Sequence, residues 1–309
     1  MARNKKNSSG VLTLRRRDIN QNWTGILLIA PAVLIILAVI LYPLGLNLVM
    51  SFQKILMMKP YLGKPFIAFE NYTKVLGDPT FWRAARNSLV WTVSSVSLQV
   101  LMGLTVAVLL NKAIKGRGAI RGMMLIPWIT PGVVAAIVWK WMYDGQFGIL
   151  NYILMALKII DHPIVWLGNV STAFPAIIFS HAWKNFPFAA VMLLAAMQII
   201  PRDLYEAADI DGANAWQKFV HITLARIRPT LYLTVLLTTI WTFNSFDTIW
   251  LMTEGGPSGS SDTLTTYVYK ATFQAFNLGK AAAIAVLMFL ALFSLVLIYA
   301  RAVQKEKDA

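Results

Sequence analysis

The sequence predicts an all-α membrane protein with six membrane-spanning helices, and two observations support this fold class. Of the 309 residues, 57% are hydrophobic and only 14% are charged, whereas soluble domains carry about 25% charged residues. Three long stretches, 19–53, 87–111 and 281–300, contain no Asp, Glu, Lys or Arg. A bilayer core needs about 20 consecutive apolar helical residues. Each stretch is therefore long enough to cross a membrane.

We expect the spanning helices at 24–52, 87–110, 123–142, 173–198, 229–252 and 279–300. We expect the third to be interrupted by Pro127 and Pro131, and the fourth by Pro175 and Pro187. Proline is tolerated in spanning helices where neighbours or water satisfy the freed carbonyl, and such kinks often line a cavity. The first apolar run is far longer than the roughly 7–15 residues of a signal-peptide core. We therefore expect it to remain as the first span.

The positions of Lys and Arg predict that both ends of the chain lie in the cytoplasm. Segments 1–22, 111–122, 199–228 and 301–309 hold 17 of the 28 Lys and Arg residues, and segments 53–86, 143–172 and 253–280 hold nine. Positive residues favour cytoplasmic loops. We expect residues 1–22 to form a disordered cytoplasmic tail, residues 23–300 the transmembrane domain, and residues 301–309 a second cytoplasmic tail. The expected location is the cell (inner) membrane.

Several other functions are disfavoured by the sequence. The net charge of +14 does not indicate nucleic-acid binding, because the cations lie in short connections between apolar runs rather than on one face of a soluble fold. The absence of Cys excludes disulfides, thiolate metal sites and Cys nucleophiles. The histidines, His162, His181 and His221, are too dispersed to predict a metal site. No phosphate-binding loop is present, so we expect a chain that is not an enzyme.

The segment 199–228 is an unusually long connection on the predicted cytoplasmic side. Asp203 and Glu206 have the spacing of a capping box, and Gly212 can end a short helix in a left-handed conformation. A second short helix from Asn214 to about Leu224 would place three apolar residues on one side: Trp216, Phe219 and Val220. Two interpretations follow, an amphipathic loop lying on the membrane or a docking element for a soluble partner.

A short motif within this connection points to a known family. Its residues are Glu206-Ala207-Ala208, Asp211-Gly212-Ala213, Phe219, Ile222, Leu224 and Pro229. They resemble the Glu-Ala-Ala loop of the integral-membrane subunits of binding-protein-dependent ABC importers, although Ala225 stands where the family usually has proline. Further segments, 66–72, 125–128, 139–141, 148–151, 183–188 and 253–257, resemble the branch that imports oligosaccharides, glycerol-phosphate and polyols. The resemblance covers nearly the whole chain beyond residue 20.

This resemblance implies a type I ABC importer permease fold and the uptake of a sugar-like solute. It also implies several partners: a second homologous permease, a dimer of ATPase subunits that bind ATP and Mg, an extracytoplasmic solute-binding protein, and membrane lipid. No cofactor is expected on this chain. The residues expected to contact an ATPase are Glu206, Ala207, Ala208, Asp211, Gly212, Ala213, Trp216 and Phe219. A glycine in such a loop permits close backbone approach.

Polar residues within spans are energetically costly and are therefore candidates for a solute pathway. Aromatic rings beside them would suit the C–H faces of sugars. On this basis we predict that the pathway contains Trp183, Lys184, Asn185, Trp241, Phe243, Asn244 and Asp247. Structural alternatives stay open: Lys184 and Asp247 can form a buried pair, and Trp183 and Trp241 can serve in helix packing or as interface anchors. A further hypothesis is that Lys184 meets an anionic group of the solute.

Two other classes of function are alternatives to the importer. A secondary transporter would need ion-coupling carboxylates inside the spans and often an internal repeat, but only Asp247 qualifies. A membrane enzyme acting on lipid would need an acidic cluster at a membrane face. Asp203, Glu206, Asp209 and Asp211 form such a group, yet the embedded Ala-Ala and Gly-Ala pattern favours docking. The variant Glu206→Lys distinguishes the two. In a docking element it would disrupt binding of the ATPase, whereas in an enzyme it would abolish the chemistry of the isolated protein.

Overall fold

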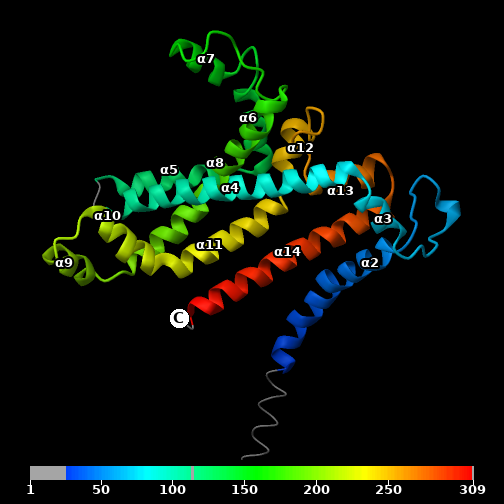
Figure 1. Ribbon diagram of the computed structural model, residues 1–309, viewed down its shortest axis with the longest axis horizontal. Coiled ribbons are helices and arrows are strands. Elements are labelled where there is room, and N and C mark those ends of the chain that lie inside the picture. Colours follow the sequence, from blue (N-terminus) through cyan, green and yellow to red (C-terminus); the bar gives the residue numbers. More distant parts are fainter. Residues whose placement is uncertain (1–25, 113–114, 308–309) are drawn as a thin grey trace, which may run out of the picture.

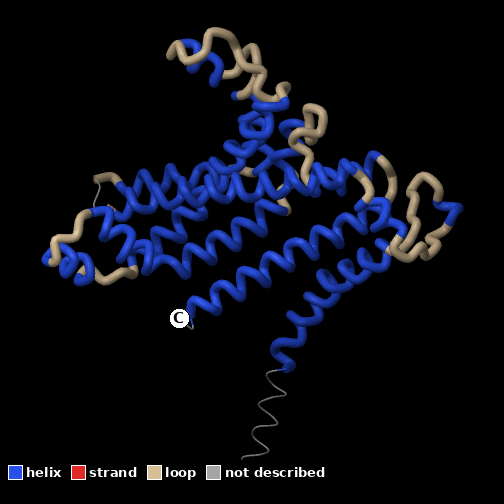
Figure 2. Tube along the Cα trace, viewed as in Figure 1, coloured by secondary structure: helices blue, strands red, loops and turns tan. Residues whose placement is uncertain are grey.

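The computed structural model describes residues 26–112 and 115–307 (Figure 1). Helices joined by loops make up the described chain (Figure 2), and its only β-type pairings are two isolated bridges, Gln53–Phe66 and Leu56–Asn277. The predicted all-α fold is confirmed. The predicted tail 1–22 lies outside the described residues.

Four helices are long and apolar enough to cross a membrane. They are Ile26–Ser51, which ends in α2 (Tyr42–Ser51), α4 (Pro79–Asn111), α8 (Val170–Gln198) and Leu278–Arg301, which is most of α14 (Leu278–Lys307). They correspond to the first, second, fourth and sixth predicted spans. Helix α8 continues through both Pro175 and Pro187, so the predicted interruption of the fourth span was wrong.

The third predicted span is a broken helix. Helices α5 (Arg117–Ile129) and α6 (Gly132–Met142) meet at 94° and amount to one span at most. The break lies at Thr130, which is extended (φ −60°, ψ 128°) and precedes Pro131. A residue before proline is pushed away from the helical region by the proline ring. The predicted interruption of this span is therefore confirmed at Pro131, whereas Pro127 lies inside α5 without breaking it.

The fifth predicted span is also interrupted. Helix α11 (Ala225–Phe243) ends before Asn244, and α12 (Asp247–Thr253) starts three residues later. In the described chain neither of these helices meets the length and composition expected of a span. Helix α11 instead buries a row of threonines, and Thr234 and Thr238 each donate to the carbonyl four residues earlier at 2.7 Å. Four spans, or five with the bent pair, are thus identified rather than six.

The sequence predicts that successive connections lie on opposite sides of the membrane, and the arrangement of the helices agrees with this. Helices α9 (Asp203–Ile210) and α10 (Ala215–Lys218) and the C-terminal end of α14 lie toward the left and lower part of Figure 1. Helices α3 (Glu70–Leu76), α7 (Ile149–Ala156) and α13 (Leu264–Tyr269) lie toward the top and right. The predicted cytoplasmic and outer segments therefore gather on opposite sides. Which side faces the cytoplasm stays a prediction.

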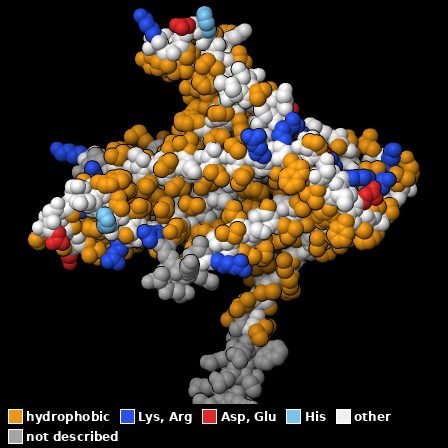
Figure 3. Space-filling view, viewed as in Figure 1, with side chains coloured by type: hydrophobic (Ala, Val, Ile, Leu, Met, Phe, Trp, Pro, Cys, Tyr) orange, Lys and Arg blue, Asp and Glu red, His pale blue; other side chains and the backbone are white. Residues whose placement is uncertain are grey.

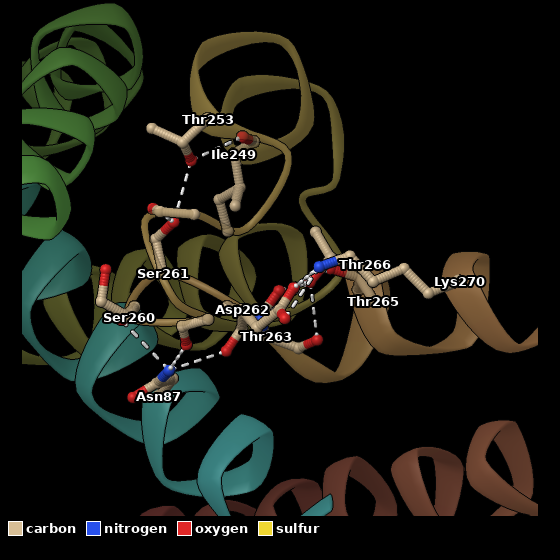
Figure 4. A network of polar contacts seen from close by, with 12 residues as sticks. Asn87, Ile249, Thr253, Ser260, Ser261, Asp262, Thr263, Thr265, Thr266 and Lys270 are labelled. Atoms are coloured by element: carbon tan, nitrogen blue, oxygen red, sulfur yellow. Dashed lines mark hydrogen bonds and ion pairs between the residues drawn. The ribbon is translucent and has the colours of Figure 1, made fainter. Parts of the chain in front are cut away.

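A polar network fixes the loop between α12 and α13 against α4 (Figure 4). The amide Nδ2 of Asn87 on α4 donates to three carbonyls of this loop, the shortest bond being 2.9 Å to Asp262. Asp262 also forms an ion pair with Lys270 at 2.7 Å, and the hydroxyls of Thr253 and Ser261 lie 2.8 Å apart. Because α12 leads directly into this loop, the network restrains the C-terminal end of α12, which itself packs against α6 and α8.

Candidate solute pathway and docking loop

A cavity of about 300 Å³ lies where the two helix breaks face α8. One wall is aromatic: the ring of Phe188 lies 6.0 Å from that of Trp128 and 4.8 Å from that of Trp241. The other lining residues are mostly polar: Gln99, Gly132, His181, Lys184, Asn185, Thr238, Thr242, Asn244, Ser245, Phe246, Asp247 and Thr248. The cavity therefore combines apolar ring faces with hydrogen-bonding groups.

The break between α5 and α6 makes room for two charged side chains. A Cβ atom on Gly132 would lie 3.8 Å from Cε of Lys184 and 3.9 Å from Oδ2 of Asp247. The two charged side chains therefore approach the same notch from α8 and α12. In the described part of the chain no ion pair within 4 Å joins them, but the two charges lie close enough to interact electrostatically.

Hydrogen bonds join four of the helices around the cavity in two pairs, α4 with α11 and α8 with α12. Nε2 of Gln99 on α4 donates to Oγ1 of Thr242 on α11 at 3.2 Å. The buried ring of His181 on α8 places Nδ1 3.4 Å from Oγ1 of Thr248 on α12. Nδ2 of Asn185 donates to the His181 carbonyl at 2.9 Å. Its Oδ1 is then left to accept a hydrogen bond from a ligand.

Five of the seven predicted pathway residues line the cavity: Lys184, Asn185, Trp241, Asn244 and Asp247. The other two lie elsewhere. The ring of Trp183 packs edge-on against Trp139 at 5.4 Å, and Phe243 packs against the core cluster that α13 and α14 share with α4.

Sequence reasoning missed several lining residues, among them Gln99, Trp128, His181 and Phe188. Trp128 and Phe188 each follow a proline inside a predicted span. Proline positions could therefore have identified both. Gln99 is a neutral amide within the uncharged run 87–111. The free-energy cost of burying an amide in a membrane span could have identified it.

The connection 199–228 folds into two helices at a left-handed glycine, as expected. Gly212 has φ of +74°, and a Cβ there would meet nothing within 4 Å. The predicted capping box at Asp203 was wrong, because Arg202 precedes the helix without a side-chain cap and Asp203 is already its first residue. The capping box occurs instead at Asn214, whose Oδ1 accepts from the amide of Gln217 at 2.9 Å.

The second helix of this connection does not stop at Leu224. It passes through a π-helical turn, Phe219–Leu224, and continues as α11. Ala225 retains the backbone N–H that proline would lack, and the helix is continuous there, as it also is at Pro229. Asp209 and Lys218 form an ion pair between the two short helices. The ring of Trp216 lies 5.7 Å from that of Phe219 and its residue is 71% exposed, which leaves an apolar surface open for a partner.

Comparison with known proteins agrees with this architecture. Residues 99–307 match the family of binding-protein-dependent transport system inner membrane components. The chain is 36% identical to the trehalose/maltose transport system permease protein of Thermococcus litoralis, over 92% of this chain and 95% of that protein. It is 34% identical to the sulfoquinovosyl glycerol transport system permease protein of Agrobacterium fabrum, over 94% and 93%.

Solved structures share the fold. One chain of a bacterial ABC transporter involved in the import of the acidic polysaccharide alginate superposes with a TM-score of 0.79 and 23% identity, covering 94% of this chain and 98% of that one. The family match spans more than half of the sequence and the relatives align along nearly all of it. The chain therefore belongs to the family of inner membrane components of binding-protein-dependent transport systems.

Proposed function

We propose that this chain is one of two permease subunits of an ATP-driven importer of a sugar or sugar-like solute. The observation that carries the proposal is the cavity between the helix breaks, with its aromatic wall and polar opposite side. Relatives named for trehalose, maltose and sulfoquinovosyl glycerol support the solute class. A soluble binding protein would deliver the solute from the outer side, and a second permease would complete the pathway.

The cavity residues have distinct roles in this proposal. The ring of Trp241 packs against a C–H face of the sugar. Asn185 and Asn244 each already donate Nδ2 to a helix carbonyl, at 2.9 and 2.8 Å, so their Oδ1 atoms accept from sugar hydroxyls. Lys184 donates to a hydroxyl or to an anionic group, and Asp247 accepts from a hydroxyl. Such spaced polar groups on an apolar wall fix the orientation of a small ligand.

The same helix connects the proposed docking loop with the cavity. From Ala215 the chain is helical without a break through α10, the π-helical turn and α11 to Phe243, a length of about 43 Å. Its far end adjoins Asn244, and Trp241 lies in its last turn. A displacement of the docking loop by a partner ATPase would therefore move cavity residues directly. ATP and Mg would be bound by that partner.

Two variants test the solute site. Trp241→Ala should raise the solute concentration for half-maximal uptake by up to about tenfold, since aromatic contacts contribute about 0.5–1.5 kcal/mol. Trp141→Ala is the matched control, because Trp141 is 75% exposed and does not line the cavity. Uptake into proteoliposomes, with the copurifying subunits identified by mass spectrometry, provides the measurement. Equal effects of the two variants would contradict the proposal that the cavity is part of the solute pathway.

A third variant tests the docking loop separately. Glu206→Lys reverses a charge on α9, and we expect loss of the copurifying ATPase while the thermal unfolding of this chain is unchanged. Lys218→Ala is the internal control, because it removes the ion pair with Asp209 without altering the Glu-Ala-Ala residues. Retention of the ATPase by Glu206→Lys, with normal uptake, would contradict the docking role.

A further inference from the structure

The segment 143–169, between α6 and α8, exposes an unusual amount of apolar surface for a loop. From Gly145 through Leu157 it contains no Asp, Glu, Lys or Arg. Phe147 is 90% exposed and Tyr152 68%, and further apolar side chains of the segment are also exposed: Ile149, Ile153, Met155, Leu157, Ile159 and Val165. An exposed apolar patch of this extent on a protein usually marks a contact with a partner or a membrane.

One buried side chain satisfies several backbone groups of the segment. Nδ2 of Asn151 donates to the carbonyl oxygens of Ile164 at 2.9 Å and Gly145 at 3.2 Å. Its Oδ1 accepts from the Ile164 amide at 3.2 Å and from Nε1 of Trp166 at 2.9 Å. The carboxylate of Asp144 accepts from two more backbone amides of the turn. Internal satisfaction of polar groups is what a lipid environment demands.

The segment also lies where the membrane surface is expected. It begins after α6 ends at Met142 and finishes where α8 begins at Val170. Exposed Trp141 and neighbouring Lys140 precede it, and aromatic and basic residues are typical of the membrane–water interface. A largely apolar groove of about 420 Å³ between α6, α7 and α8 continues the apolar surface onto the spanning helices.

The charged residues of the segment are separated from this apolar surface. Lys158, Asp161 and His162 follow the uncharged stretch, and in Figure 3 basic, acidic and histidine side chains lie at the end of the upper arm with hydrophobic atoms below them. This division into a charged tip and an apolar base is the pattern of an interfacial segment.

We propose that residues 145–157 are embedded in the outer leaflet of the bilayer, with α7 lying at the interface and the groove beneath it occupied by a phospholipid acyl chain. A soluble partner that binds and leaves would expose this apolar surface to water between encounters, whereas the bilayer covers it at all times. The segment thereby anchors the outer ends of α6 and α8, two of the helices that line the cavity.

The cysteine-free sequence allows a direct test by site-directed spin labelling. Single variants Phe147→Cys and Tyr152→Cys, with Asp161→Cys as the control at the charged tip, are labelled with a nitroxide in the full-length chain within its purified complex in lipid nanodiscs. Power saturation compares collision with oxygen, which concentrates in the acyl region, and with a water-soluble nickel chelate.

We expect the labels at 147 and 152 to collide several-fold more with oxygen than with the nickel chelate, and the label at 161 to show the reverse. Preference for the nickel chelate at 147 and 152 would place these residues in water and overturn the proposal. Immobile labels that neither reagent reaches would indicate a protein partner instead, and would overturn it equally. Solute uptake by the three unlabelled variants is the control for folding. This control is valid whether the segment lies in lipid, in water or against a protein.

Discussion

Gly103 lies at the closest approach of α4 and α8. A Cβ atom at this position would lie 2.6 Å from Cβ of Ala189 and 2.8 Å from the backbone nitrogen of Ala190. Non-bonded carbon atoms prefer a separation of about 3.5–4.0 Å. The variant Gly103→Ala therefore requires α4 and α8 to move apart by about 1 Å, because neither obstacle is a flexible side chain.

The expected cost follows from two opposing effects. Overpacking of this kind costs about 1–3 kcal/mol, and replacing a helical glycine by alanine returns up to about 1 kcal/mol. We expect a net loss of about 1–2 kcal/mol, which lowers an unfolding temperature by a few degrees. Gly45→Ala in α2 is the control, since a Cβ there would meet nothing within 4 Å. Gly45→Ala should therefore only be stabilised, by the higher helix propensity of alanine.

The assay is thermal unfolding in mild detergent, followed by tryptophan fluorescence, together with uptake into proteoliposomes. Gln99 lies one helical turn from Gly103, and Asn185 lies one turn from Ala189, so separation of the helices should also weaken solute uptake. An unfolding temperature for Gly103→Ala equal to or above that of Gly45→Ala would refute the packing argument. A lower unfolding temperature with unchanged uptake would refute only the link from packing to the cavity.

Three further predictions concern polar groups. Burial opposes the charge of Asp78, but hydrogen bonds led by those from Tyr267 and Lys280 hold the pKa of its carboxyl well below the usual range. The unfolding temperature should therefore fall as the pH drops below about 3.9, the pKa of an Asp in the unfolded chain. For Asp78→Asn the unfolding temperature should depend less on pH. Asn151→Ala should cost about 1–3 kcal/mol by leaving buried backbone groups unpaired, measured as a lower unfolding temperature than that of Tyr152→Ala. Lys184→Ala should abolish uptake of an anionic solute with assembly intact; loss of the copurifying subunits would favour a structural role.

Two long helices of the fold were predictable from charge spacing alone. The spans 87–110 and 279–300 were placed inside the helices α4 and α14, because an uncharged run of this length has few alternatives to crossing a bilayer. The two short helices of 199–228 were also predictable, since Gly212 marks their junction. The error at Asp203 arose because several polar residues in one loop can each act as a cap, and local spacing does not choose among them.

The helix breaks were harder to predict, and both of them border the cavity. Pro131 marked the first break, but proline also occurs twice in α8, which continues without interruption. The second break, at Asn244–Phe246, contains neither proline nor glycine. There Nδ2 of Asn244 donates to the carbonyl of Ile240 at 2.8 Å, and the backbone N–H of Asn244 donates to the same carbonyl at 3.4 Å, so the side chain competes with the last backbone bond of α11.

The same chemistry explains why the pathway residues and the breaks coincide. Asn244 and Asp247 were predicted as pathway residues because they are polar inside an apolar run, and the polarity that identifies them also competes with helix formation. An uninterrupted helix over 229–252 would keep its backbone groups bonded to one another and leave only side chains for a ligand. The interruption turns the start of α12 toward α8, where Asp247 and Lys184 border the notch at Gly132. Irregular backbone inside a membrane is tolerated only where it lines a cavity or is buried in protein, so a polar cluster within a predicted span predicts a break as well as a site.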